Sequence, residues 1–98
     1  MFIHAVLFEI SLREAAAYRK DCKMWARYAK KAKGFMGYFT MKRQDSKNQY
    51  ASVYEWKTEA GHKRFMKKYH DWLVGKSKAR VKVLGYYNLK AIDVVGGK

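Results

Sequence analysis

Residues 33–56, KGFMGYFTMKRQDSKNQYASVYEW, are the most informative part of the chain for predicting its fold. It contains two β-rich runs, residues 34–43 and 50–57, separated by a cluster of turn-forming residues at 45–48. Two such runs around a short polar cluster predict a β-hairpin. Side chains of a strand alternate between two faces, and here apolar or aromatic residues occupy much of both. We therefore expect both faces of the hairpin to be covered.

The composition predicts one folded domain over residues 1–98, because 49% of the residues are hydrophobic and 16% are aromatic. Cys22 is the single cysteine, so a disulfide framework and a multi-cysteine metal site are excluded, and we expect no metal. The start, MFIHAVLFEI, has no basic region or cleavage site, and no run approaches about 18 apolar residues. We therefore expect a soluble, cytoplasmic protein with no membrane partner.

The formal net charge of +14 is large for 98 residues. Such a charge attracts nucleic acid or small anions, and it also promotes solubility. The Lys and Arg residues are spread over most of the chain, which favours a generally basic surface over one dedicated polyanion site.

The segments on either side of the hairpin predict the rest of the topology. Residues 2–10 alternate as a strand, and Ser11 and Glu14 have the spacing of a capping box for a helix that runs to about residue 33. Gly34 suits the left-handed position that ends a helix. Thr58 is expected to cap a second helix, which Gly75 ends.

Residues 86–95 alternate as a last strand, whereas residues 76–85 fit either a short helix or an irregular crossing. The order βαββαβ predicts an α+β, ferredoxin-like fold with a four-stranded antiparallel sheet and two helices on one face. A sheet that is apolar on both faces then needs a second cover, and a second copy of the chain would supply it.

The chain resembles the antibiotic biosynthesis monooxygenase domain family. The similarity rests on the KGFMG sequence at 33–37, on SVYEWKTEA at 52–60, and on an aromatic helix that reaches His70. The resemblance implies a homodimer that forms a dimeric α+β barrel. It also implies a cofactor-independent monooxygenase-like protein, with no cofactor of its own, that acts on a small apolar or polyaromatic molecule.

Other members of this family bind and degrade haem, and others have no known activity. The haem-degrading branch uses an asparagine in the first strand, a tryptophan in the second helix and a later histidine ligand. The corresponding region of the first strand here holds Val6, Leu7 and Phe8, Phe65 takes the tryptophan position, and His70 alone lies near the ligand position. A haem-binding relative and a non-catalytic ligand-binding domain stay open as alternatives.

The candidate site is an aromatic pocket between the helices and the sheet. His70 and Tyr69 are the catalytic candidates. The residues expected to bind substrate are Tyr28, Tyr38, Phe65 and Trp72. The same aromatic residues would also simply fill a core.

Three other candidates have simpler interpretations. His4 is expected to be a hydrogen-bonded core or interface residue, and His62 is expected to face solvent. Cys22 lies on the apolar stripe of the first helix, where a thiol is inert.

RNA binding is the alternative from another class, since RNA-recognition motifs share the βαββαβ order and suit a basic chain. The aromatic signature of those motifs belongs on the third strand, whereas Lys33-Gly34-Phe35 opens the second. Nucleic acid is therefore the less favoured partner.

Overall fold

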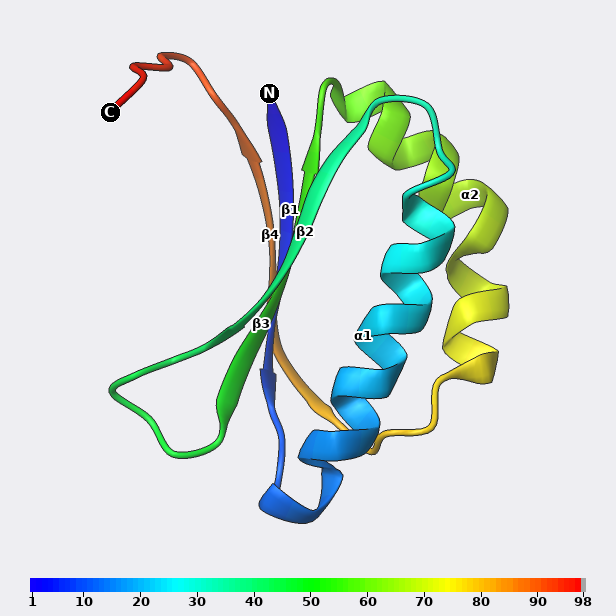
Figure 1. Cartoon of the computed structure of the whole chain (residues 1–98), viewed down its shortest axis with the longest axis vertical. Helices are drawn as coiled ribbons and strands as arrows, with labels where there is room; N and C mark the ends of the chain where they lie inside the picture. Colours follow the sequence, from blue (N-terminus) through cyan, green and yellow to red (C-terminus); the bar gives the residue numbers. More distant parts are fainter. Residues whose placement is uncertain (98) are drawn as a thin grey trace.

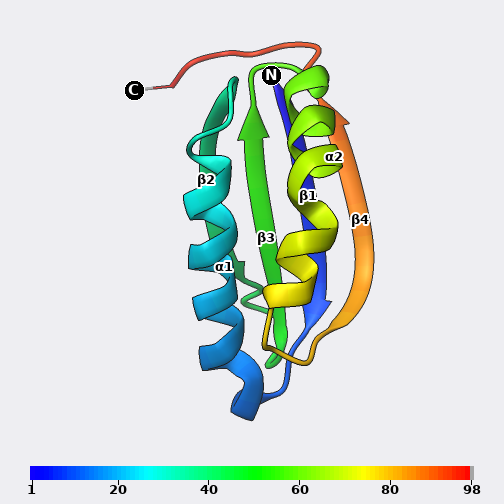
Figure 2. The same cartoon turned by 90° about the vertical axis from the view of Figure 1, so that its right-hand side faces the viewer.

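Four antiparallel strands form one sheet in the computed structural model, which describes residues 1–97. The strands are β1 (Phe2–Glu9), β2 (Phe35–Lys42), β3 (Gln49–Trp56) and β4 (Lys82–Lys90), and their order in the sheet is β2-β3-β1-β4. Helices α1 (Ala15–Ala29) and α2 (Glu59–Lys76) pack on one face of this sheet (Figures 1 and 2). The ferredoxin-like βαββαβ prediction is confirmed.

The helix boundaries agree in part with the sequence. Gly34 has a φ of 88°, as expected for the residue after a helix, although α1 already ends at Ala29. The Thr58 side chain accepts a hydrogen bond from the Gly61 amide and caps α2. Gly75 does not end α2, because the helix continues to Lys76 before an irregular crossing begins.

The predicted capping box before α1 is wrong. Residues Leu12–Glu14 form a short 3₁₀ helix, and the Ser11 side chain caps nothing. The Glu14 carboxylate accepts a hydrogen bond from the Arg80 amide at 2.8 Å, so it holds the crossing to β4 instead of the start of the helix.

A β-bulge at Met36 changes which side chains of β2 share a face. Phe35 pairs with Trp56 and Gly37 pairs with Glu55, so one extra residue stands between the two pairs. As a result Phe35 packs against the Trp56 ring in the core, whereas Phe39 and Met41 lie on the opposite face of the sheet. Simple alternation along the strand predicts that Phe35 and Phe39 share a face, and the bulge is the reason that they do not.

The core lies between the helices and the sheet and has two clusters. The larger contains the fully buried side chains Trp56 and Leu73 together with Phe65, and the smaller contains Ile10, Tyr18 and Cys22. The cavity described below lies between the same two layers.

The other face of the sheet has no helix over it (Figure 1). Phe39 is 50% exposed, Met41 55% and Leu89 56%, and the apolar side chain of Ile92 follows in the exposed segment after β4. A monomer therefore exposes apolar side chains over this whole face. Among residues 1–97, no helix has the length and apolar character needed to cross a membrane.

Candidate functional site

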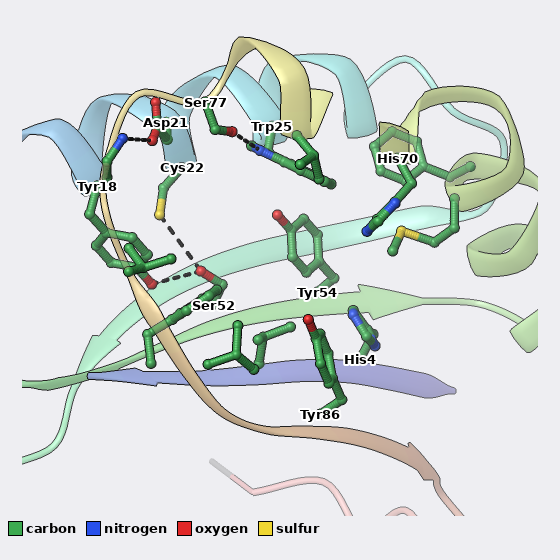
Figure 3. A pocket seen from close by; sticks show the side chains of 18 of the residues that line it. His4, Tyr18, Asp21, Cys22, Trp25, Ser52, Tyr54, His70, Ser77 and Tyr86 are labelled. Carbon is green, nitrogen blue, oxygen red and sulfur yellow. Dashed lines mark hydrogen bonds between the residues drawn. The ribbon is translucent and has the colours of Figure 1, made fainter. Parts of the chain in front are cut away.

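A cavity of about 320 Å³ lies between the helical layer and the sheet. Side chains of β1, β3 and β4 form its floor, and α1, α2 and residues 77–81 form its roof and sides. Most of the wall is aromatic or aliphatic, and polar groups gather at two places (Figure 3). We call these the histidine end and the hydroxyl end.

Helix α2 turns one stripe of side chains toward the cavity. His62, Met66, His70 and Val74 follow one another at four-residue steps, which place them on one face of the helix. Gly61 precedes His62 in the first turn and lies close to the backbone of Lys33, which holds the start of α2 against the rest of the fold. His62 is therefore buried, at 9% exposure, and the expectation that it faces solvent is wrong.

The histidine end contains His4 and His62, whose ring centroids lie 4.4 Å apart. His4 is 7% exposed, and its Nδ1 lies 2.7 Å from Oδ1 of Asn88 on β4. With the amide oxygen as acceptor, Nδ1 carries the proton and Nε2 is the basic nitrogen. Nε2 makes no hydrogen bond to any side chain of the described chain.

Both histidines are held neutral. Burial lowers the pKa of His4, against the opposing effect of its bond to Asn88. Burial and the neighbouring His4 ring lower the pKa of His62 to about 4. At neutral pH the cavity therefore contains two uncharged imidazoles, one of them oriented by an amide.

The hydroxyl end is a closed hydrogen-bond network around Ser52. The Tyr38 hydroxyl donates to Ser52 Oγ at 3.1 Å, and Tyr18 Oη and Cys22 Sγ lie 2.7 Å and 3.6 Å from the same oxygen. Burial raises the pKa of both tyrosines, so their hydroxyls stay protonated. Because a serine hydroxyl has one proton and two lone pairs, these three neighbours satisfy it.

The two ends therefore differ in what they offer a ligand. At the histidine end the Tyr54 hydroxyl makes no hydrogen bond to a described residue, and it points into the cavity in Figure 3. The indole nitrogen of Trp56, another lining residue, is buried without a partner among residues 1–97. A polar group of a ligand therefore finds free partners in the Tyr54 hydroxyl and in Nε2 of His4, whereas the Trp56 nitrogen has no accessible surface to offer it.

Residues 77–81 cross from α2 to β4 and close one side of the cavity with Ser77, Ala79 and Val81. The Asp21 carboxylate on α1 accepts hydrogen bonds from the amides of Lys78 and Ala79, at 3.0 Å and 2.8 Å. The Trp25 indole donates to Ser77 Oγ at 3.0 Å. The crossing is thus attached to α1, although it has no regular structure.

The structure brings some of the candidate residues together and separates others. Phe65 and His70 line the cavity. Tyr38 reaches it only through the hydrogen bond to Ser52. Tyr69 and Tyr28 line a second, smaller depression, and Trp72 is 46% exposed beside Tyr28.

The displacement of Tyr69 and Trp72 has one cause. The spacing of Phe65, Tyr69 and Trp72 predicts one shared face of α2, but the stripe that faces the cavity begins at His62 and continues through Met66 to His70. Sequence reasoning also missed Tyr86 and Asn88, since the position of β4 relative to β1 is set only in the folded sheet.

The described part of the chain contains no group of three or more His, Cys, Asp or Glu side chains arranged to hold a metal ion. The main reactive groups of the cavity are the two neutral histidines, His4 and His62, which lie beside aromatic rings.

Comparisons with known proteins found no matching family model and no matching curated protein. Solved structures match over nearly the whole chain. SnoaB, a cofactor-independent oxygenase from Streptomyces nogalater, is 12% identical with a TM-score of 0.76, and the match covers 98% of this chain and 97% of that one. A protein assigned as an antibiotic biosynthesis monooxygenase, from Deinococcus radiodurans, is 14% identical with a TM-score of 0.72, at 100% and 99% coverage.

The haem degrader MhuD from Mycobacterium tuberculosis also matches, at 13% identity and a TM-score of 0.74, over 98% of this chain and 100% of that one. Identities this low establish the fold alone. The resemblance seen in residues 33–70 is confirmed at that level: the chain has the ferredoxin-like fold of the antibiotic biosynthesis monooxygenases.

Proposed function

We propose that the cavity binds a small, flat, apolar or polyaromatic molecule and that the protein oxidises it with dioxygen without a cofactor. The observation that supports this most is the unbonded Nε2 of His4, a neutral base in the wall of an aromatic cavity. A volume of about 320 Å³ is at the lower end of the range typical of ligand sites. This volume suits a substrate of two or three fused rings.

In the proposed reaction His4 is the general base. Nε2 removes a proton from an activated CH₂ group of the substrate, while Nδ1 keeps its own proton and donates it in the hydrogen bond to the Asn88 oxygen. The substrate anion then reduces dioxygen with its own electrons. One oxygen atom becomes a new carbonyl group, and the other leaves as water with the two hydrogens of the CH₂ group, so no external reductant is consumed.

Positions of the other candidates assign them different roles in this proposal. His70 contacts the substrate from the α2 side, because it lines the cavity. Phe65 contributes apolar wall, and Tyr38 supports Ser52. Tyr69 does not line the cavity, so we assign the base to His4 in its place.

The test is oxygen consumption with a hydroxyanthrone, a tricyclic compound with an activated CH₂ group, as probe. We expect one dioxygen consumed for each quinone formed, with label from ¹⁸O₂ in the new carbonyl. His4→Phe should lower kcat by about 10²–10⁴-fold, the usual contribution of a general base. Tyr69→Phe is the matched control and should leave the rate unchanged.

An unchanged rate of oxidation in the His4→Phe variant would show that His4 is not the general base. Saturable binding of the probe with no oxygen uptake would instead identify a non-catalytic ligand-binding protein. Trp25 and Trp56 line the cavity, so tryptophan fluorescence reports binding in either case.

Haem binding is the second candidate, and His70 is the observation that favours it. Its Nδ1 lies 3.0 Å from the Asp71 carboxylate, so Nε2 is free to act as a ligand from the cavity edge. The cavity in its present shape does not fit the group, however, because about 320 Å³ is at the lower end of the range for ligand sites and a tetrapyrrole macrocycle needs more space. We derive no haem chemistry for this chain.

We also propose that the functional unit is a homodimer. Phe39, Met41, Tyr87 and Leu89 are all about half exposed on the uncovered face of the sheet. Exposed apolar patches of this kind are rare on monomers, and a second copy would cover the face with matching side chains.

A further inference from the structure

A second depression, of about 220 Å³, lies between the end of α1 and the first half of α2. These two stretches lie side by side because the helices run in opposite directions (Figure 1). The depression is separate from the substrate cavity, apart from the shared wall residue Phe65.

The depression is strongly basic. Four of its nine lining residues carry a positive charge and none carries a negative one; they are Lys31, Lys33, Arg64 and Lys68. None of the ion pairs formed within residues 1–97 involves these four side chains. Glu59, the acidic residue in the first turn of α2, pairs instead with Lys63 at 3.5 Å. A concave surface lined by charges of one sign concentrates its field on a bound counter-ion.

Aromatic rings form part of the same surface. The Tyr28 and Tyr69 ring centroids lie 5.5 Å apart, so α1 and α2 each contribute one ring. Lys31 Nζ lies 5.6 Å from the Tyr28 ring centroid, and Lys68 Nζ lies 5.3 Å from that of Tyr69. Each ammonium group is thus positioned at the edge of the depression by an aromatic face.

We propose that this depression binds a phosphate-bearing aromatic ligand, of the kind found in a nucleotide. Four unpaired cations match the charge of a di- or triphosphate better than that of a single carboxylate. The tyrosine rings supply a surface on which a planar base stacks. The same chemistry is present in a free nucleotide and at the end of a single nucleic-acid strand. The proposal is independent of the oxidation chemistry, since it uses neither His4 nor His62.

The probes are ATP, pyrophosphate and a short oligothymidylate, with binding measured by titration calorimetry at low salt. We expect ATP to bind more tightly than pyrophosphate, because the base adds stacking. Replacing Arg64→Gln and Lys68→Gln together should weaken ATP binding by roughly 5- to 30-fold, as expected for two exposed charge contacts. Both side chains are exposed, so the variant should fold normally.

The control variant combines Lys47→Gln with Lys57→Gln, two exposed residues that do not line the depression. It lowers the net charge by the same amount and should change ATP affinity by less than about twofold. Equal losses in the two variants, or no binding of any probe, would overturn the proposal. If the variant with Arg64→Gln and Lys68→Gln is impaired, the two probes identify the source of the ligand. Tighter binding of the oligonucleotide than of ATP then indicates a nucleic-acid strand, and tighter binding of ATP indicates a free nucleotide.

Discussion

Replacing His62 by Phe should make the fold less sensitive to acid. His62 packs against Phe2 and His4, with ring centroids 5.2 Å and 4.4 Å away, so a phenyl ring replaces it in largely apolar surroundings. In the native protein the pKa of His62 is lowered to about 4, whereas it is 6.5 in the unfolded chain. The neutral form is thus favoured by folding, and stability is lost as the pH falls from 6.5 towards 4.

The size of the effect follows from these two pKa values. One unit of pKa corresponds to about 1.4 kcal/mol, and integration from pH 7 to pH 4.5 gives a loss of about 2.4 kcal/mol for His62 alone. Because the ring borders a cavity that admits solvent, screening reduces this, and we expect about 1.5–2 kcal/mol. Phenylalanine binds no proton, so the His62→Phe variant should avoid this part of the loss.

The assay is urea unfolding of both proteins at pH 7 and pH 4.5, at one fixed protein concentration because the apparent stability of a dimer depends on concentration. The carboxylates titrate in both proteins, so their contribution cancels in the comparison. An NMR titration of the His62 ring gives its pKa directly. Parallel losses of stability in the two proteins, or a His62 pKa near 6.5, would refute the reasoning.

Three further predictions concern assembly, the crossing and haem. Sedimentation at micromolar concentration should give a dimer. Met41→Lys should shift the protein to monomer, because a charge then lies in the exposed apolar face of the sheet. A native protein that sediments as a monomer would contradict the proposed assembly. Asp21→Asn should cost about 1–3 kcal/mol of stability and speed amide hydrogen exchange at Lys78 and Ala79, because an amide replaces the carboxylate that accepts from both. Asp93→Asn, at an exposed position, is the control. Equal exchange rates in the two variants would show that Asp21 does not hold the crossing. Titration with haem should give no saturable Soret shift at stoichiometric concentration. Tight binding that is lost in His70→Ala would contradict this and would show that the cavity can enlarge enough to hold the macrocycle.

The fold could be predicted from residues 33–56 and their flanks because its determinants are local in the sequence. Alternation in the strands and turn formers at 45–48 determine the hairpin, Thr58 caps the start of α2, and Gly34 takes the left-handed conformation in the turn between α1 and β2. The errors came from long-range contacts. Glu14 has the spacing of a capping residue, yet its carboxylate bonds to an amide 66 residues away. No local pattern contains that information.

The candidate site was harder to predict because it depends on how distant elements are aligned. His4 and His62 meet only because β1 lies beneath the first turn of α2, and His4 finds Asn88 only because the β1–β4 register pairs those two residues. Each histidine alone has an ordinary interpretation. Together, in the aromatic wall of the cavity, they form a neutral pair with a free basic nitrogen.

The crossing at residues 77–81 shows why a segment with no recognisable pattern still shapes the site. It has no alternation and no helix signal. The Ser77 amide still bonds to carbonyl groups of α2, but residues 77–81 belong to no helix or strand. Asp21 supplies the missing partners by accepting two adjacent amides, and Trp25 fixes Ser77. All three contacts come from the face of α1 that borders the cavity. Since Ala79 and Val81 then form one side of that cavity, the shape available to a ligand depends on a carboxylate that need not touch the ligand at all.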